Sequence, residues 1–152
     1  MMIHLAVIQP EIAGNVGTLM RLATCMDLFL HIVGPLGFVW SDKHLWRAGM
    51  DYAPNGPWMR HTSWDDYRCY VQNQKGAGRT LATAPAMGTP YTAFSFQPHD
   101  HIILGKESKG LESEQIAQCD HVVHIPMHKH ARSLNMAIAG AIVVSEALRQ
   151  VR

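Results

Sequence analysis

The sequence has few charged residues. Asp, Glu, Lys and Arg together make up 16% of its 152 residues, whereas roughly a quarter is usual for a globular chain. Hydrophobic residues make up 47%, which excludes an intrinsically disordered chain and leaves apolar surface that oligomerisation would hide. The net charge is only +1 with histidine neutral, so any binding of nucleic acid must come from a local basic patch.

The sequence also lacks a disulfide framework, a signal peptide and a membrane span. Its three cysteines are widely spaced and form no Cys-x-x-Cys motif, which fits a reducing cytoplasm. No basic segment precedes the apolar residues 3–8, which therefore predict a strand. The apolar run from Ala137 is shorter than ~18 residues and is interrupted by Ser145 and Glu146, so it predicts no membrane helix. Without linkers or repeats, residues 1–152 are expected to form a single domain of a cytoplasmic protein.

Apolar runs and helical periodicity alternate along the chain. Strands are predicted at 3–8, 28–33, 58–62, 80–84, 101–104 and 121–125, and helices at 15–26, 42–47, 63–74, 112–118 and 133–149. This alternation predicts an α/β fold in which helices flank a parallel sheet. Residues 85–98 form the longest irregular stretch and are the expected functional loop.

Two glycines flank an asparagine where the first predicted helix begins. Gly14 and Gly17 enclose Asn15, and Arg21 follows on the same helix. Glycines between a strand end and a helix start allow a phosphate or another backbone segment to approach closely. The alternative interpretation is an asparagine that caps the helix and an arginine exposed to solvent.

A turn rich in glycine and charge follows the strand at 101–104. It runs from Gly105 to Gly110 and includes Lys106 and Glu107. It does not fit the Walker phosphate-loop pattern, but open α/β sheets bind ligands at the carboxyl ends of their strands. The alternative is a plain glycine-capped turn whose charges are exposed.

The most informative segment runs from His124 to Met136. Pro126 ends a short strand, a polar loop follows, and Ser133 is expected to cap the last helix. The helix start offers unpaired backbone N–H groups beside the Ser133 hydroxyl and the Asn135 amide. This combination predicts a site for a small polar ligand.

Potential metal ligands lie close to this segment at Cys119, His121, His124, His128 and His130. A zinc site needs several such side chains to converge. His121 and His124 fall on opposite faces of a strand, and the last two histidines lie in a loop. We therefore expect solvated histidines and no metal, and a histidine-based metal protein remains an alternative hypothesis.

These motifs, in this order, resemble the SPOUT class of RNA methyltransferases. Within that class the chain is similar to the small tRNA (cytidine/uridine-34-2'-O)-methyltransferases of the TrmL (YibK) kind. The resemblance covers essentially the whole chain and is carried by five segments: Pro10 to Leu22, His31 to Lys43, Arg47 to Tyr52, Gly105 to Leu111, and Ile125 to Asn135.

The resemblance implies a C-terminal trefoil knot, although knots are nearly absent from proteins. It also implies a homodimer, which the apolar last helix favours independently, and S-adenosylmethionine as the cofactor, without a metal. The implied cofactor-binding residues are Ala84, Gly105, Ile125, Met127, Ser133 and Leu134. The implied catalytic-site residues are Asn15, Arg21, Glu107, Ser133 and Asn135. Ala137 and Ile138 depart from the family, in which Ser and Asn are common at these positions.

The implied reaction is 2'-O-methylation of the wobble ribose of tRNA, at cytidine 34 or 5-carboxymethylaminomethyluridine 34, in tRNA-Leu. Arg21 then acts either as the base or as a clamp on a neighbouring phosphate, and we favour the clamp because arginine has a pKa of about 12.5–13.8. The anticodon stem-loop is expected to contact basic and aromatic residues: Lys43, Arg47, Tyr52 and Arg60, with Trp40 and Trp46 as stacking platforms. For Trp40 a core position is equally compatible with the sequence.

Two further alternatives remain at this point. One is a knotted RNA-binding domain that has lost turnover, which the departures at Ala137 and Ile138 keep open. The other is a 2'-O-methyltransferase that acts at another RNA site.

Overall fold

The computed structural model describes residues 2–49 and 56–152, except for the side chains of residues 48 and 49. In this part of the chain, seven parallel strands form one sheet in the order β3-β2-β1-β6-β4-β7-β5. The strands are β1 (His4–Ile8), β2 (Phe29–Val33), β3 (Trp58–His61), β4 (Thr80–Thr83), β5 (Thr89–Pro90), β6 (His101–Leu104) and β7 (His121–His124). The helices are α1 (Ala13–Met26), α2 (Asp42–Gly49), α3 (Trp64–Asn73), α4 (Ser113–Ala117) and α5 (Met136–Val151), with a 3-10 turn at Tyr91–Ala93. The predicted α/β class is confirmed.

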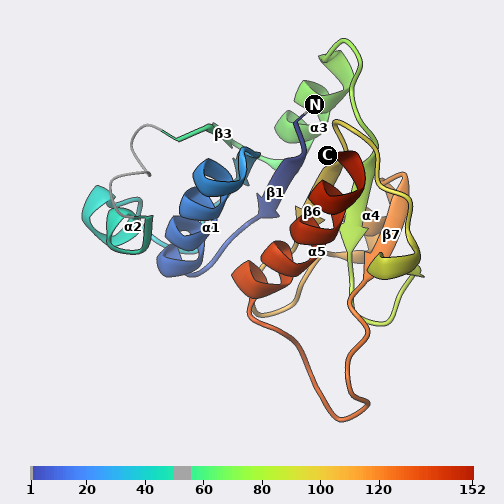
Figure 1. The fold of residues 1–152 in the computed structure, drawn as a ribbon. Helices are drawn as coiled ribbons and strands as arrows, with labels where there is room; N and C mark the ends of the chain where they lie inside the picture. Colours follow the sequence, from blue (N-terminus) through green and yellow to red (C-terminus); the bar gives the residue numbers. More distant parts are fainter. Residues whose placement is uncertain (1, 50–55) are drawn as a thin grey trace.

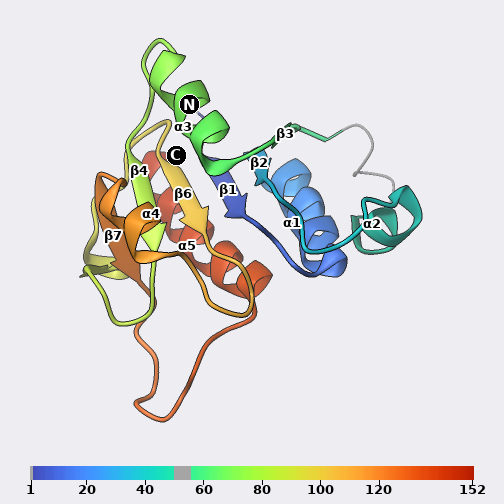
Figure 2. The same ribbon diagram turned by 180° about the vertical axis from the view of Figure 1, so that it is seen from behind.

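Alternating residues of each central strand serve two different cores. In β1, Leu5 and Val7 belong to the core that α1 and α5 cover, whereas Ala6 and Ile8 belong to the core beneath α3. Figure 1 shows α1 and α5 lying side by side over the first face of the sheet. Figure 2 shows α3 and α4 on the opposite face. Because both faces are covered, the central strands read as continuous apolar runs.

The last helix packs tightly on the centre of the sheet. At Gly140 a Cβ atom would lie 2.8 Å from Leu104 Cδ1, so a larger residue would require the Leu104 side chain to shift. Val143 and Val144 are buried on the same side of α5, while Ile138 on the outer side is 54% exposed. The helix therefore buries one apolar face within the chain and leaves another apolar face outside.

Helix boundaries differ from the sequence prediction at two places that matter for function. The last helix begins at Met136, and Asn135 is its N-cap, because the Asn135 side chain accepts hydrogen bonds from the backbone N–H groups of Ala137 and Ile138. The prediction that Ser133 caps this helix was wrong. The first helix begins at Ala13, so Asn15 lies inside its first turn and caps nothing.

Candidate active site at the carboxyl edge of the sheet

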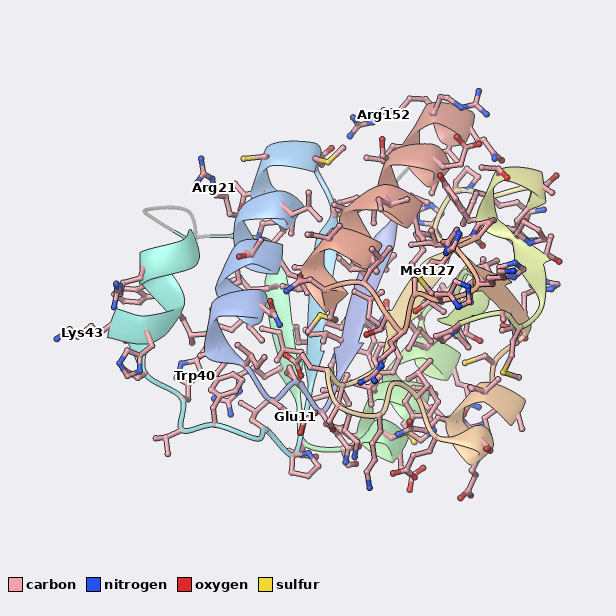
Figure 3. The ribbon with its side chains drawn as sticks, turned by 90° about the horizontal axis from the view of Figure 1, so that it is seen from below. Glu11, Arg21, Trp40, Lys43, Met127 and Arg152 are labelled. Atoms are coloured by element: carbon pink, nitrogen blue, oxygen red, sulfur yellow. The ribbon has the colours of Figure 1, made fainter. Side chains whose placement is uncertain are left out.

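Three segments distant in sequence meet at the carboxyl edge of the sheet. β1 and β6 are neighbouring parallel strands, so the loop after Ile8 and the turn after Leu104 leave the sheet side by side. The N-terminus of α5 reaches the same place because α5 packs on both β6 and α1. Figure 3 shows Glu11, in the first of these loops, near the ends of the central strands.

Glu107 joins two of the three segments. Its Oε2 accepts a hydrogen bond from the backbone N–H of Glu11 at 2.7 Å. Its Oε1 accepts from the backbone N–H of Ile12 at 3.0 Å and from Asn15 Nδ2 at 3.1 Å. Three donors on one carboxylate hold its charge in a fixed position, so Glu107 fixes the start of α1 against the turn after β6.

Glu11 completes a reciprocal contact between the same two segments. Its Oε1 accepts hydrogen bonds from the backbone N–H of Ser108 at 2.9 Å and from the Ser108 hydroxyl at 2.7 Å. These two bonds are the main reason that the pKa of Glu11 lies below its usual value. We did not single out Glu11 or Ser108 in the sequence, because their partners become visible only when β1 and β6 are adjacent.

Two asparagines extend the contact to the third segment. Asn15, which is only 8% exposed, accepts a hydrogen bond on Oδ1 from Asn135 Nδ2 at 3.1 Å. The Asn135 Oδ1 already caps α5, and the Asn15 Nδ2 already donates to Glu107. Each amide orientation is therefore fixed by its other partner. We call Glu107, Asn15 and Asn135 the carboxylate–amide bridge, and it unites the three sequence motifs.

Ser133 and Arg21 lie outside this bridge. Ser133 is exposed in the loop before α5, and Arg21 is exposed on α1. Among the described residues neither side chain makes a hydrogen bond or an ion pair. Figure 3 shows Arg21 and Met127 on opposite sides of α5. Within one chain, the structure therefore does not bring Arg21 to the predicted cofactor residues.

The predicted cofactor residues follow three neighbouring strands. Gly105, Ala84 and Ile125 come directly after β6, β4 and β7, which are adjacent in the sheet. Ala84 is buried and donates its backbone N–H to the Val123 carbonyl at 3.1 Å. Ile125 and Met127 are half-buried. These residues line a shared edge of the sheet, whereas Leu134 lies farther along the loop and is 40% exposed.

Gly105 is required for a reason that the sequence did not indicate. A Cβ atom at this position would lie 2.1 Å from the carbonyl carbon of Gly110 and 2.2 Å from the backbone nitrogen of Leu111. Gly110 has a φ of +68°, and its N–H donates to the Lys106 carbonyl, which closes the turn. Any larger residue at position 105 would open this turn. Gly105 is therefore needed for the turn itself, independently of any ligand.

The predicted RNA-contacting residues lie on α2 and β3. Lys43, Arg47 and Arg60 are exposed, and Figure 3 shows Lys43 pointing away from the body of the molecule. The Arg60 guanidinium lies 4.3 Å from the ring centroid of Trp40, a cation–π contact. Trp40 is half-buried and packs against the core, so the core interpretation describes it better than a free stacking platform. Tyr52 lies outside the described residues.

The histidines near Cys119 do not gather. Cys119 Sγ lies 3.3 Å from the Gln115 carbonyl, and His124 Nδ1 lies 2.9 Å from the Met87 carbonyl. His128 and His130 are exposed in the loop before α5. In residues 2–49 and 56–152, this set forms no group of three ligand atoms with the spacing of a metal site.

A different group of histidines, missed in the sequence, is buried beneath α3. His4 Nδ1 and His31 Nε2 are 3.0 Å apart, and His31 Nδ1 and His61 Nε2 are 2.9 Å apart. The Tyr67 hydroxyl lies 2.9 Å from His101 Nδ1, and the rings of His4 and His101 stack at 4.2 Å. We call these five residues the histidine network. They share one face because His4 pairs with His101, Ala6 pairs with His31, and Val33 pairs with His61 across the parallel strands.

Burial keeps the histidine network uncharged. Desolvation, with smaller contributions from neighbouring histidines, lowers the pKa of His31 to about 2 and that of His101 to about 3. The same cause lowers the pKa of the half-buried His4 to about 4. At neutral pH each ring therefore has one N–H and one unprotonated nitrogen.

No described helix is both long enough and apolar enough to cross a membrane.

A shallow hollow lies over the outer face of α5 and is lined by Tyr91, Ile138, Ala141, Ile142, Ser145 and Glu146. It contains the apolar side chains that α5 does not use within the chain.

Comparison with known proteins places this geometry in one family. The model of the SpoU rRNA methylase family matches residues 2–145. A tRNA (cytidine(34)-2'-O)-methyltransferase of Beijerinckia indica is 42% identical over 147 residues, which cover 97% of this chain and 91% of that protein. A solved structure described as giving insights into 2-OH methylation of C/U34 on tRNA has a TM-score of 0.91 and 34% identity, and the match covers 98% of this chain and 95% of that one.

A second similar solved structure contains a bound ligand. The SpoU methyltransferase AviRb of Streptomyces viridochromogenes, in complex with the cofactor AdoMet, has a TM-score of 0.88 and 26% identity, with a match that covers 98% of this chain and 57% of that one. These matches extend over nearly all of the chain, including the three segments joined by the carboxylate–amide bridge. The chain thus belongs to the SpoU methylase family, and the resemblance found in its sequence is confirmed.

Proposed function

We propose that the protein transfers a methyl group from S-adenosylmethionine to the 2'-hydroxyl of the wobble nucleotide 34 of tRNA, cytidine or 5-carboxymethylaminomethyluridine. The observation that supports this most is the carboxylate–amide bridge, which joins the three family motifs at the carboxyl edge of the sheet. The relative from Beijerinckia indica has this activity in its name. We extend the proposal to tRNA-Leu as the substrate and to the cytoplasm as the location.

The residues at this edge fit the proposed cofactor. Ile125 and Met127 offer half-buried apolar surface for an adenine, and the ends of three strands offer backbone N–H and C=O groups. Gly105, Ala84, Ser133 and Leu134 complete the proposed site. When bound there, S-adenosylmethionine supplies an activated methyl group on a sulfonium, so the protein has only to align the reacting atoms and remove a proton.

Within this site the carboxylate–amide bridge positions the groups that contact the ribose, and Arg21 contacts the RNA phosphate. Glu107 already accepts three hydrogen bonds, so we assign it the task of holding Asn15 rather than that of a base. Asn15 and Asn135 each have a second amide N–H, without a hydrogen bond among the described residues, that can orient the ribose. Arg21 clamps the adjacent phosphate by a bidentate contact, and a phosphate oxygen takes the proton.

We infer that the active unit is a homodimer. Arg21 and Met127 lie on opposite sides of α5 in one chain, so a second copy must bring an arginine to each cofactor site. The apolar hollow over α5, with Ile138 54% exposed, supports α5 as the interface.

Replacement of Ile142 by Asp places a carboxylate in this hollow and should cost several kcal/mol if the hollow is buried between copies. Sedimentation should then show monomers, with S-adenosylmethionine still bound but without methyl transfer. Val39→Asp is the matched control, because Val39 is 87% exposed and lies outside α5. A dimeric Ile142→Asp protein would remove α5 from the interface.

We also propose that residues 1–152 form one domain and that its C-terminal part is knotted. The chain leaves the central strand β6, adds β7 beyond β4, and returns through a long loop to place α5 over β6. Figure 1 shows this loop extending below the sheet before α5 begins. Lys43, Arg47, Tyr52 and Arg60 are the proposed contacts to the anticodon stem-loop.

The test is methyl incorporation into two anticodon stem-loops that differ in one atom. One has cytidine at position 34 and the other has 2'-deoxycytidine, so only the first offers the proposed acceptor. We expect radiolabelled methyl groups in the first RNA alone. Equal labelling of both would move the reaction to another RNA site, and S-adenosylmethionine binding without labelling of any tRNA would favour a binding domain without turnover.

A further inference from the structure

The histidine network lies on the strands beneath α3 and runs from the first residues of β1 and β6 to His61, the last residue of β3. His4 and His101 are the first residues of β1 and β6, whereas the carboxylate–amide bridge is built on the segments that follow these strands and on the start of α5. The network lies on the face beneath α3, with Tyr67 of α3 as one of its members. The methyl-transfer chemistry uses none of these side chains.

We propose that His4, His31 and His101 form a binding site for one divalent transition-metal ion of the zinc class. One ring nitrogen from each residue lies within 4.8 Å of the other two. In a tetrahedral zinc site, with Zn–N distances of about 2.0–2.1 Å, ligand nitrogens are roughly 3.3 Å apart. The separation of 3.0 Å between His4 Nδ1 and His31 Nε2 is already close to this value.

Two of the three proposed ligands already have the supporting contacts that metal-bound histidines need. In protein metal sites, the ring nitrogen that does not bind the metal donates its N–H to a fixed acceptor. His31 can donate from Nδ1 to His61 Nε2, at 2.9 Å. His101 can donate from Nδ1 to the Tyr67 oxygen, at 2.9 Å. When His31 and His101 donate in these two contacts, the remaining nitrogen of each ring is unprotonated and can bind a metal.

The proton balance of binding is simple. The hydrogen bond between His4 and His31 is replaced by two metal–nitrogen bonds, and the proton of that bond moves to the outer nitrogen of His4. Each ring keeps one N–H, so a cation binds without net loss of protons from the neutral network. The His4 ring must turn out of its stack on His101, and its half-buried position gives the metal and a fourth, water ligand a path of entry.

The choice of metal follows from the ligands. Three neutral imidazoles, without a thiolate or a carboxylate, suit zinc and its neighbours rather than magnesium or calcium. The site would tie β1, β2 and β6 together beneath α3. Since α5 and the carboxylate–amide bridge are elsewhere, this metal is separate from the methyl-transfer site.

The test is equilibrium dialysis of the full chain, freed of metal by a chelator, against Zn²⁺ at neutral pH. We expect one ion per chain, and a tetrahedral spectrum when Co²⁺ replaces Zn²⁺. His4→Asn and His101→Asn should each weaken binding at least 10-fold, and Tyr67→Phe should weaken it about 10-fold by freeing the His101 ring. His4 is only half-buried, so its variant keeps the fold even if replacement of His101 does not.

The matched control is His128→Asn, because His128 and His130 are exposed with ring centroids 5.3 Å apart and could hold an ion at the surface. This variant should bind Zn²⁺ as the unchanged protein does. Loss of binding in His128→Asn, or full binding in His4→Asn, would overturn the proposal. So would the absence of any Zn²⁺ binding to the unchanged protein.

Discussion

The sheet carries two polar networks in opposite surroundings. At the carboxyl edge, the carboxylate–amide bridge joins loops and helix starts, and both its member Asn135 and the nearby Ser133 are exposed. Beneath α3, the histidine network lies on the strands themselves, from the starts of β1 and β6 to the end of β3, and His31 and His101 are at most 2% exposed. Polar groups on loops can satisfy one another and still meet a substrate, whereas polar groups on a covered sheet face must satisfy one another completely. Changes in the two networks should therefore have separable effects.

The largest expected effect is at Arg21. Arg21→Ala should lower methyl transfer to tRNA on the order of 100-fold or more, since it removes a preorganised positive charge from the transition state. Arg21→Lys should keep part of the activity, and both variants should bind S-adenosylmethionine normally by calorimetry. Tyr67→Phe, in the histidine network, is the control and should leave the rate unchanged.

The pH dependence of the Arg21→Lys variant separates the clamp from a base. A lysine base, with a pKa of about 10.4, would move the pH–rate profile to lower pH. A clamp would lower the plateau and keep the shape of the profile. Full activity of Arg21→Ala would contradict both roles.

The second effect belongs to the histidine network and is one of stability. The folded chain keeps His31 and His101 neutral, with pKa values of about 2 and 3, while the unfolded chain protonates them near pH 6.5. The unfolded state therefore binds more protons below pH 6.5, so stability is highest above this pH and falls as the solution is acidified.

For these two residues the slope should be about 3 kcal/mol per pH unit between pH 6 and pH 4. Denaturant unfolding of metal-free protein at a series of pH values measures it. His101→Asn removes the contribution of one histidine and should lower the slope by about 1.4 kcal/mol per pH unit, while the other histidines of the network keep their contributions. Arg21→Ala should leave it unchanged, and a flat stability profile would contradict the neutral buried network.

The third effect tests the link between Asn135 and Asn15. Asn135→Asp keeps an oxygen that caps α5, so the contribution of the cap to stability should be retained. It loses the amide donor, however, and brings a carboxylate toward Asn15 Oδ1. Asn15 cannot turn its amide without facing its oxygen toward Glu107, so methyl transfer should fall.

Asn135→Ala should lose the same activity and also about 1 kcal/mol of stability from the missing cap. Denaturant unfolding and methyl incorporation, measured on both variants, separate the two roles. Equal activity of the Asp variant and the unchanged protein would show that the bridge does not position the substrate.

The sequence predicted the strands and helices well because their signals are local. β6 was predicted at its observed bounds, and the other elements differ by a few residues. The short strand β5 and the 3-10 turn at Tyr91–Ala93 were missed inside the stretch expected to be irregular. β5 has only two residues, and its pairing with β7 cannot be read from its own composition.

The two networks differ in how far they could be predicted. Asn15 and Asn135 were singled out because each lies near a helix start with recognisable neighbours, whereas Glu107 was assigned to the site through the family resemblance. His4, His31 and His101 belong to three different strands, and nothing near each histidine in sequence indicates the others. They meet only because β1 lies between β2 and β6 with a particular register, which is a property of the whole sheet.

The smallest expected effect is at Ser133, where the sequence prediction of the cap was wrong. Ser133 and Asn135 are both good N-cap residues and are two positions apart, so local preference cannot choose between them. In the structure Asn135 is the N-cap, and its side-chain Nδ2 also donates a hydrogen bond to Asn15 Oδ1. Ser133→Ala should therefore change stability by less than ~0.5 kcal/mol, as expected for an exposed position away from such features, in contrast to Asn135→Ala. Thermal unfolding of the two variants side by side measures the difference. A loss of about 1 kcal/mol in Ser133→Ala would restore Ser133 as the cap, whereas weaker S-adenosylmethionine binding at unchanged stability would place its hydroxyl on the cofactor.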